Sequence, residues 1–432
     1  MGFALGYPGG VTIVHCTKTL VLSLAMITAL AGGGARAEEP ATAATPVATA
    51  TPAPLAPVTS ANPLIVHTLY TWYDEASFKK AAVQPLEQFS SDDPDYYRRY
   101  FSRLRADGVD VIAGVLTGLP GERAKDGKPL PTVYQADNLV RILPAIGAAG
   151  MKTFIYYDTA IRSYWKNGLS TTQLEMTNPA LRGQLLDDFA WIADEVVKKH
   201  MDGYLFLQDT AGRDVVDEDG LKRPVIAIYI ARALKDAPGF PNVAQVLDRE
   251  LTGAFHRRGL GRPALVLDAI FWGPRPFDSG LVKACGRNAV ALTAFCPVTS
   301  RSDVKKLGDW VPLFERLYRE AADELLSLAK RGELSREIQV WPGVMPNFET
   351  TSDRSSKAHS LGEWEAMLRM GLQATRRLTP DEREEPIRAM TVIYADEYYE
   401  GTPLISAGPF GTLPLTAQGS VLKDAGIWLE RF

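Results

Sequence analysis

The chain has 432 residues, of which 46% are hydrophobic and 23% are charged, a composition typical of a globular protein with a sizeable core. Its formal net charge is −4 at pH 7 and no basic stripe runs along the sequence, which argues against a nucleic-acid-binding protein. The length suits one large domain or two domains of average size.

The first 37 residues have the pattern of a secretory signal peptide. Lys18 precedes an apolar stretch, Thr19–Leu30, and Ala35-Arg-Ala37 provides small residues at a cleavage site. We therefore expect a secreted or periplasmic protein, with an uncleaved membrane anchor as the alternative. Residues 38–62 form an Ala/Thr/Pro tract that is typical of a flexible linker. No later apolar run reaches the roughly 18 residues that span a bilayer, so no membrane span is expected in the mature chain.

Two cysteines, Cys285 and Cys296, remain after the leader. An exported protein allows them to form a disulfide. Cys296 also follows an apolar run, residues 289–295, so a small buried thiol is the alternative. The four histidines after His15 are scattered singly, and we expect no metal site and no cofactor.

Eight short hydrophobic runs, each about six residues long, recur between stretches of helical periodicity. Nearly continuous hydrophobicity over this length is typical of parallel strands that are covered on both faces. The runs are Leu64–Tyr70, Val109–Val115, Lys152–Tyr157, Pro224–Ile230, Ala264–Ile270, Val290–Phe295, Ile338–Gly343 and Met390–Ala395.

Between these runs, apolar residues at spacings of three and four predict amphipathic helices. The predicted helices are Asp95–Ala106, Asn138–Ala149, Leu181–Lys199, Val243–Arg258, Trp310–Lys330 and Leu361–Arg377. This alternation predicts an α/β protein with a (β/α)8 TIM barrel over residues 63–432. A doubly wound open sheet is the alternative, but no Gly-x-Gly-x-x-Gly turn follows the first strand. Residues 204–223 are expected to form a hairpin that leads into the fourth strand.

Aromatic and acidic residues gather at the carboxyl ends of the predicted strands, where a TIM barrel carries its active site. Any one of them is explained equally well as a cap on the core. Their recurrence at six of the eight strand ends is typical of a carbohydrate cleft, where aromatic faces stack on sugars and acids bind hydroxyls. The candidate substrate-binding residues are Trp72, Tyr73, Tyr157, Asp158, Tyr229, Asp268, Trp272, Trp341, Tyr398 and Tyr399.

Two glutamates three residues apart, Glu397 and Glu400, follow the last predicted strand. Glycosidic bond cleavage requires one carboxyl that is protonated and can donate to the leaving oxygen, and a second that is ionised. We therefore take Glu397 and Glu400 as candidate catalytic residues. Two solvated acids in a polar loop is the alternative.

The segment at residues 396–402, Asp-Glu-Tyr-Tyr-Glu-Gly-Thr, resembles the Asn-Glu-Trp-x-Glu-Gly-Thr segment of glycoside hydrolase family 99, the endo-α-mannosidase-like barrels. Weaker matches follow in the same order along the chain, and together they span most of residues 63–425. They are Phe89–Pro94, Phe154–Asp158, Arg223–Tyr229 and Trp341–Gly343.

The resemblance implies a retaining glycosidase. It assigns Glu400 as the general acid/base, and Glu397 as the base that activates the sugar 2-hydroxyl, which attacks C1 to give a 1,2-anhydro intermediate. Asp158 matches a third-strand acid that contacts the substrate near C2. The sequence departs from the family at Asp396 and at Tyr398-Tyr399, so the contacts inside the cleft differ.

The expected function is that of an exported, monomeric, endo-acting glycoside hydrolase whose partner is an α-linked polysaccharide or oligosaccharide. A non-catalytic glycan-binding or envelope polysaccharide-processing accessory on the same barrel is one alternative. A metal-dependent hydrolase is another, and it requires clusters of His and Asp at strand ends.

The leader pattern predicts cleavage after Ala37 and a mature chain that begins at Glu38. N-terminal sequencing of the exported protein measures this directly. Retention of the first 37 residues would show a membrane anchor instead.

Overall fold

A computed structural model describes the chain over the following residues: 64–71, 84–85, 90–91, 93–106, 108–130, 136–168, 174–209, 212–231, 234, 236, 238–271, 275–294, 310–334, 338–344, 347–348, 357–358, 389–392 and 407–408. The predicted leader, the linker and the predicted helix Leu361–Arg377 lie outside the described residues.

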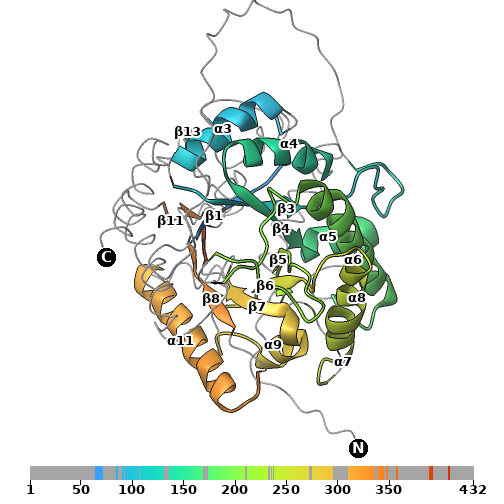
Figure 1. Cartoon of the computed structure of the whole chain (residues 1–432), viewed down its shortest axis with the longest axis vertical. Helices are drawn as coiled ribbons and strands as arrows, with labels where there is room; N and C mark the ends of the chain where they lie inside the picture. Colours follow the sequence, from blue (N-terminus) through green and yellow to red (C-terminus); the bar gives the residue numbers. More distant parts are fainter. Residues whose placement is uncertain are drawn as a thin grey trace, which may run out of the picture.

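The centre of the structure is a parallel sheet, in which each of the eight predicted runs contributes a strand (Figure 1). The strands are β1 (Leu64–Leu69), β3 (Val111–Leu116), β4 (Lys152–Asp158), β5 (Val225–Tyr229), β6 (Ala264–Asp268), β7 (Ala289–Thr293), β8 (Gln339–Trp341), β9 (Gly343–Val344) and β12 (Ala389–Val392).

The two ends of this sheet are consecutive pieces of one stretch of chain. The strand order is β8-β7-β6-β5-β4-β3-β1-β12-β9, and only Pro342 separates β8 from β9. Residues 339–344 therefore pair with β7 on one side and with β12 on the other, and all pairs are parallel. The sheet closes on itself, and the predicted TIM barrel is confirmed.

Helices surround the sheet (Figure 1). The α-helices are α3 (Pro94–Ala106), α4 (Ala136–Ala148), α5 (Thr159–Asn167), α6 (Pro179–Trp191), α7 (Pro241–Ala244), α8 (Thr252–His256), α9 (Ser279–Cys285) and α11 (Trp310–Lys330). A π-helical segment, η4 (Ile192–Val197), and a 3-10 turn, η5 (Lys198–His200), continue α6, so the predicted helix Leu181–Lys199 is present with its last turns distorted. A second π-helical segment, η7 (Gln245–Leu251), joins α7 to α8, and the 3-10 turn η8 (Gly286–Asn288) follows α9. Two short antiparallel pairs form sheets of their own: β2 (Gln84–Pro85) with β13 (Ala407–Gly408), and β10 (Asn347–Phe348) with β11 (Lys357–Ala358).

The helix ends follow the local sequence. The Asp93 carboxylate accepts hydrogen bonds from the amides of Asp95 (2.9 Å) and Tyr96 (3.2 Å), which caps α3 directly before Pro94. Beyond the end of α4, Gly150 has a φ of 74°, which glycine adopts without strain. The start of α3 and the end of α4 each lie within one residue of the predicted bounds.

The strands are buried on both faces, since every residue of β1, β3, β6 and β7 is buried. Cys285 at the end of α9 is buried and free, which contradicts the disulfide with Cys296. Cys296 lies outside the described residues. Among the helices that the structure describes, none is both long enough and apolar enough to cross a membrane.

Replacing Asp93 by Ala removes the cap of α3 and should lower the free energy of unfolding by about 1 kcal/mol. Asp93→Asn keeps an acceptor and should stay close to the wild type. Chemical denaturation of the two variants measures the difference, and equal stability of both would show that the cap does not form.

Candidate active site

Five residues from five neighbouring strands form one register row at the carboxyl edge of the barrel. Asp158 pairs with Tyr229, Asp268 pairs with Thr293, and Thr293 pairs with Trp341. The pairing between β5 and β6 runs to Ile228 and Leu267, directly before Tyr229 and Asp268. Register partners in a parallel sheet point to the same face, so the five side chains share one face.

Tyr157 identifies which face this is. Its hydroxyl donates a hydrogen bond to Asp188 of α6 at 2.8 Å, and its ring lies 5.1 Å from the Phe189 ring, so Tyr157 points out toward the helices. Its neighbours Tyr156 and Asp158 therefore point into the barrel. The Tyr156 ring lies 6.1 Å from the Tyr229 ring, in agreement with this direction. Asp158, Tyr229, Asp268 and Trp341 of the predicted site thus come together on the inner face, while Tyr157 does not join them.

Asp158 lies in an environment that strongly perturbs its carboxyl. Its side chain is buried, and its Oδ1 accepts a hydrogen bond from the amide of Ile161 at 2.8 Å, which caps α5. Burial raises the pKa of this carboxyl to about 7. The amides of Ile161 and Ala160 and the charge of Arg162 act in the opposite direction, whereas the charge of Asp268 adds to the rise. Asp158 can therefore be a hydrogen-bond donor below neutral pH and an acceptor above it.

Asp268 fixes the backbone where β5 ends. Its Oδ2 accepts a hydrogen bond from the amide of Ile230 at 2.8 Å, and the hydroxyl of Thr159 donates to the carbonyl of Tyr229 at 2.6 Å. Ile230 has a φ of 49°, a conformation that a β-branched residue adopts only when its surroundings impose it. Side chains from the start of α5 and the end of β6 thus hold the turn that follows Tyr229.

Thr293 at the end of β7 was missed by the sequence reasoning. Its hydroxyl is buried and has no hydrogen-bond partner within the described part of the chain. The sequence could have indicated Thr293, because it is the single polar residue of the strand Ala-Val-Ala-Leu-Thr and lies at the carboxyl end of that strand. Trp341 is also buried, and its Nε1 donates to Gln339 at 3.2 Å, so Trp341 forms part of the inner wall and is not an exposed platform.

The remaining predicted site residues lie outside the described residues: Trp72, Tyr73, Trp272, Glu397, Tyr398, Tyr399 and Glu400. The last strand of the barrel, β12, nevertheless indicates at which edge of the sheet the chain continues toward the two glutamates. It runs parallel to β1 and ends at Val392, so the chain leaves the sheet at the same edge as Asp158. Glu397 and Glu400 follow in the sequence.

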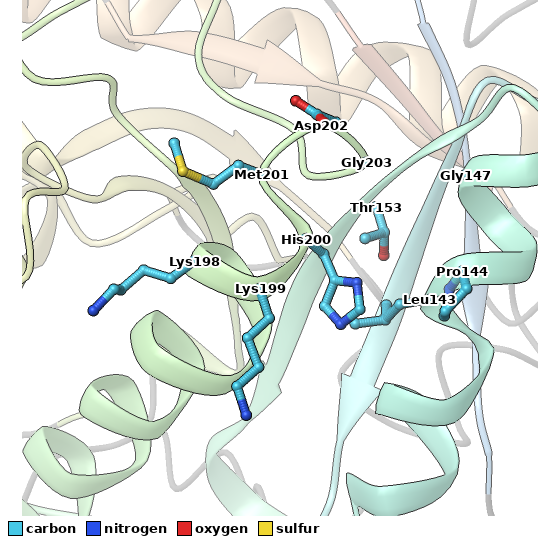
Figure 2. A pocket seen from close by; sticks show the side chains of 10 residues that line it. All are labelled: Leu143, Pro144, Gly147, Thr153, Lys198, Lys199, His200, Met201, Asp202 and Gly203. Atoms are coloured by element: carbon cyan, nitrogen blue, oxygen red, sulfur yellow. The ribbon is translucent and has the colours of Figure 1, made fainter.

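A pocket of about 360 Å³ lies at the other end of the barrel (Figure 2). Thr153, near the start of β4, lines it together with the last turns of α4 and the residues that follow α6. In Figure 2 the His200 ring points toward Leu143 and Pro144. The pocket is therefore separate from the carboxyl edge that carries Asp158.

No family model matches the chain, and no curated protein matches it in sequence. Solved structures with a similar fold exist. One is a family 99 endo-α-mannosidase from Bacteroides thetaiotaomicron in complex with Bis-Tris propane, with a TM-score of 0.52 and 13% identity over 85% of this chain and 96% of that chain. Another, described as a glycoside hydrolase-like protein, has a TM-score of 0.56 and 13% identity over 86% of this chain and 96% of that chain. The fold is therefore that of the glycoside hydrolase TIM barrels, as the resemblance at residues 396–402 implied. At this identity the likeness shows the fold alone.

The stability of the protein should depend on pH through Asp158. Burial raises the pKa of this carboxyl from 3.8 to about 7, so its protonated form stabilises the fold at low pH and this contribution is lost as the pH rises toward 7. Asp158→Asn is uncharged at every pH and keeps a capping oxygen. Its melting temperature relative to that of the wild type should therefore rise between about pH 4 and about pH 8. Thermal unfolding of both proteins across this range measures the effect, and a constant difference contradicts it.

Proposed function

We propose that the protein is an exported glycoside hydrolase that cleaves an α-linked polysaccharide or oligosaccharide within its chain, with retention of configuration. The observation that carries the proposal is the buried, inward-pointing carboxyl of Asp158 at the carboxyl edge of a closed barrel. The strand β12 ends at this same edge, directly before the sequence that contains Glu397 and Glu400. In TIM-barrel enzymes this edge is where catalytic residues from different strands meet.

In the proposed reaction Glu400 donates a proton to the leaving glycosidic oxygen while the bond to C1 breaks. Glu397 removes the proton of the sugar 2-hydroxyl, and the O2 atom of the sugar attacks C1 to form a 1,2-anhydro sugar. Glu400, now ionised, then deprotonates a water molecule whose oxygen attacks C1 while the C1–O2 bond breaks, and Glu397 returns its proton to O2. Two displacements at C1 give net retention. These roles rest on the resemblance of residues 396–402 to family 99.

Asp158 and Asp268 are proposed to bind sugar hydroxyls next to the reacting centre. Both carboxyls are buried and their charges interact, an environment in which hydrogen bonds to a substrate are stronger than in water. Tyr229 and Trp341 contribute the aromatic part of the same wall.

Incubation of residues 38–432 with a panel of α-linked polysaccharides tests the proposal, with new reducing ends and product size as readouts. Release of shortened oligosaccharides supports an endo-acting hydrolase. Binding of a glycan without cleavage would favour the accessory protein. Within the described residues, no group of three or more His, Cys, Asp or Glu side chains is placed to hold a metal ion, so no observation there favours the metal-dependent hydrolase.

Glu400→Gln should reduce hydrolysis of the natural glycan by about 10²- to 10⁴-fold, because the leaving oxygen loses its proton donor. An activated aryl glycoside needs little protonation and should be spared in comparison. Glu397→Gln should slow both substrates alike, because Glu397 acts at the sugar. Steady-state kinetics of the two variants on both substrates provide the measurement.

The reverse pattern in the two variants would exchange the roles of the glutamates. Full activity of both would show that this segment is not catalytic.

A further inference from the structure

A second charged cluster lies behind the inner wall, on the outer side of β4. Its centre is Arg162, whose guanidinium is fully buried, and its acids are Asp188 and Glu122 with 0% and 10% of their side chains exposed. Arg162 belongs to α5, Asp188 to α6, and Glu122 to the segment between β3 and α4. The cluster therefore joins three segments of the chain, two of which directly follow strand ends at the carboxyl edge.

The guanidinium binds both acids in a fork. Its Nε and Nη2 donate to Asp188 at 2.9 and 2.6 Å, while Nη2 also donates to Glu122 at 3.1 Å and Nη1 donates to the other oxygen of Glu122. The hydroxyl of Tyr157 donates a further hydrogen bond to Asp188, and the amide of Leu119 donates one to Glu122 at 2.9 Å. Only arginine has the planar donor set for two such contacts, since lysine offers a single ammonium.

The contacts within the cluster favour the ionised forms of Glu122 and Arg162. Burial opposes the ionisation of Glu122, but the hydrogen bond and the charge of Arg162 outweigh it and lower the pKa of this carboxyl. The two acids also raise the pKa of Arg162 against the effect of burial. A buried ion cluster is often no more stabilising than apolar residues of the same volume, so net stability does not by itself account for it. What the cluster does supply is one fixed arrangement of the three segments.

Helix α5 connects this cluster to the inner wall. Asp158 is the last residue of β4 and α5 begins at Thr159, without an intervening loop. Asp158 caps the helix through the amide of Ile161, and Arg162 is the next residue. The direction of the Asp158 carboxyl and the position of α5 are therefore coupled through adjacent residues.

We propose that Arg162 is a positioning residue of the sugar site: by joining Glu122 to Asp188, it holds α5 so that the Asp158 carboxyl stays in its place on the inner wall. This inference rests on the proposed function, in which Asp158 contacts the substrate. The charge of Arg162 also favours the ionised form of Asp158, which burial and the charge of Asp268 oppose.

Arg162→Lys tests the proposal, and Arg262→Lys is the matched control. Arg262 is likewise buried, with 4% of its side chain exposed, and it likewise joins two acids, Glu218 and Asp248. It precedes β6, so it lies at the amino-terminal end of the barrel, away from Asp158. In both variants a guanidinium that joins two acids is replaced by an ammonium, so both should lose thermal stability.

Only Arg162→Lys is expected to lower kcat/KM, by about 10- to 100-fold, because a misplaced binding group costs that much. If the ionised Asp158 is the active form, removing the fork should also move the acid limb of the pH profile to higher pH, since a positive charge near this carboxyl is displaced. A folded Arg162→Lys variant with kcat/KM within about twofold of the wild type and an unshifted profile overturns the proposal.

Hydrogen exchange of the amides of α5 separates this inference from the proposed function, because it requires no substrate. Exchange in α5 should be faster by about tenfold or more in Arg162→Lys and unchanged in Arg262→Lys. If the wild type cleaves no glycan but α5 loosens in this way, the proposed function fails and the positioning role stands. Unchanged exchange in α5 overturns the positioning role.

If Arg162→Lys does not fold, Glu122→Gln replaces it. This variant keeps the Arg162–Asp188 pair and weakens only the link to the segment after β3, because glutamine offers one neutral acceptor oxygen in place of the carboxylate. Glu218→Gln is its control at the Arg262 cluster. The same selective loosening of α5 is expected, to a smaller extent, and its absence overturns the proposal.

Discussion

Closure of the sheet is the constraint on which the rest of the structure depends. Residues 339–344 pair with β7 through β8 and with β12 through β9. Because the strands are parallel and their register is fixed around the ring, their last residues meet at one edge. This geometry brings Asp158, Asp268 and Trp341 together on one wall although they are far apart in the sequence.

The alternation of side chains along β4 then separates two kinds of polar chemistry. Asp158 points inward, where burial raises its pKa toward neutrality. Tyr157 points outward and completes the ion cluster of Arg162, Asp188 and Glu122. The inner carboxyl can donate a hydrogen bond when it is protonated and accept one when it is ionised. The acids of the outer cluster are bound by Arg162, Tyr157 and the amide of Leu119. Adjacent residues of one strand thus support different tasks, one at the site and one in the frame behind it.

The sequence was sufficient for the architecture, because each strand is a short hydrophobic run and β-propensity and burial act together there. It was also sufficient for placing Asp158 and Asp268 at the same edge, since Asp158 directly follows one predicted strand and Asp268 lies near the end of another. It did not determine which of Tyr157 and Asp158 faces inward, because both faces of a parallel strand are apolar and the pattern has no polar side. The helix α5 was missed since it follows β4 without a break. The partners of Arg162 lie 40 and 26 residues away, beyond any local pattern. The φ of Ile230 is likewise set by Asp268 from another strand.

The fold is shared with glycoside hydrolases, and the proposed chemistry predicts the anomeric form of the first product. Following the anomeric configuration of the first product by proton NMR, as residues 38–432 digest an α-linked polysaccharide, tests the account most directly. Two displacements at C1 predict that the α-anomer of the new reducing end appears first and then mutarotates. A β-anomer as the first product, or no product from any α-linked glycan, would contradict the account.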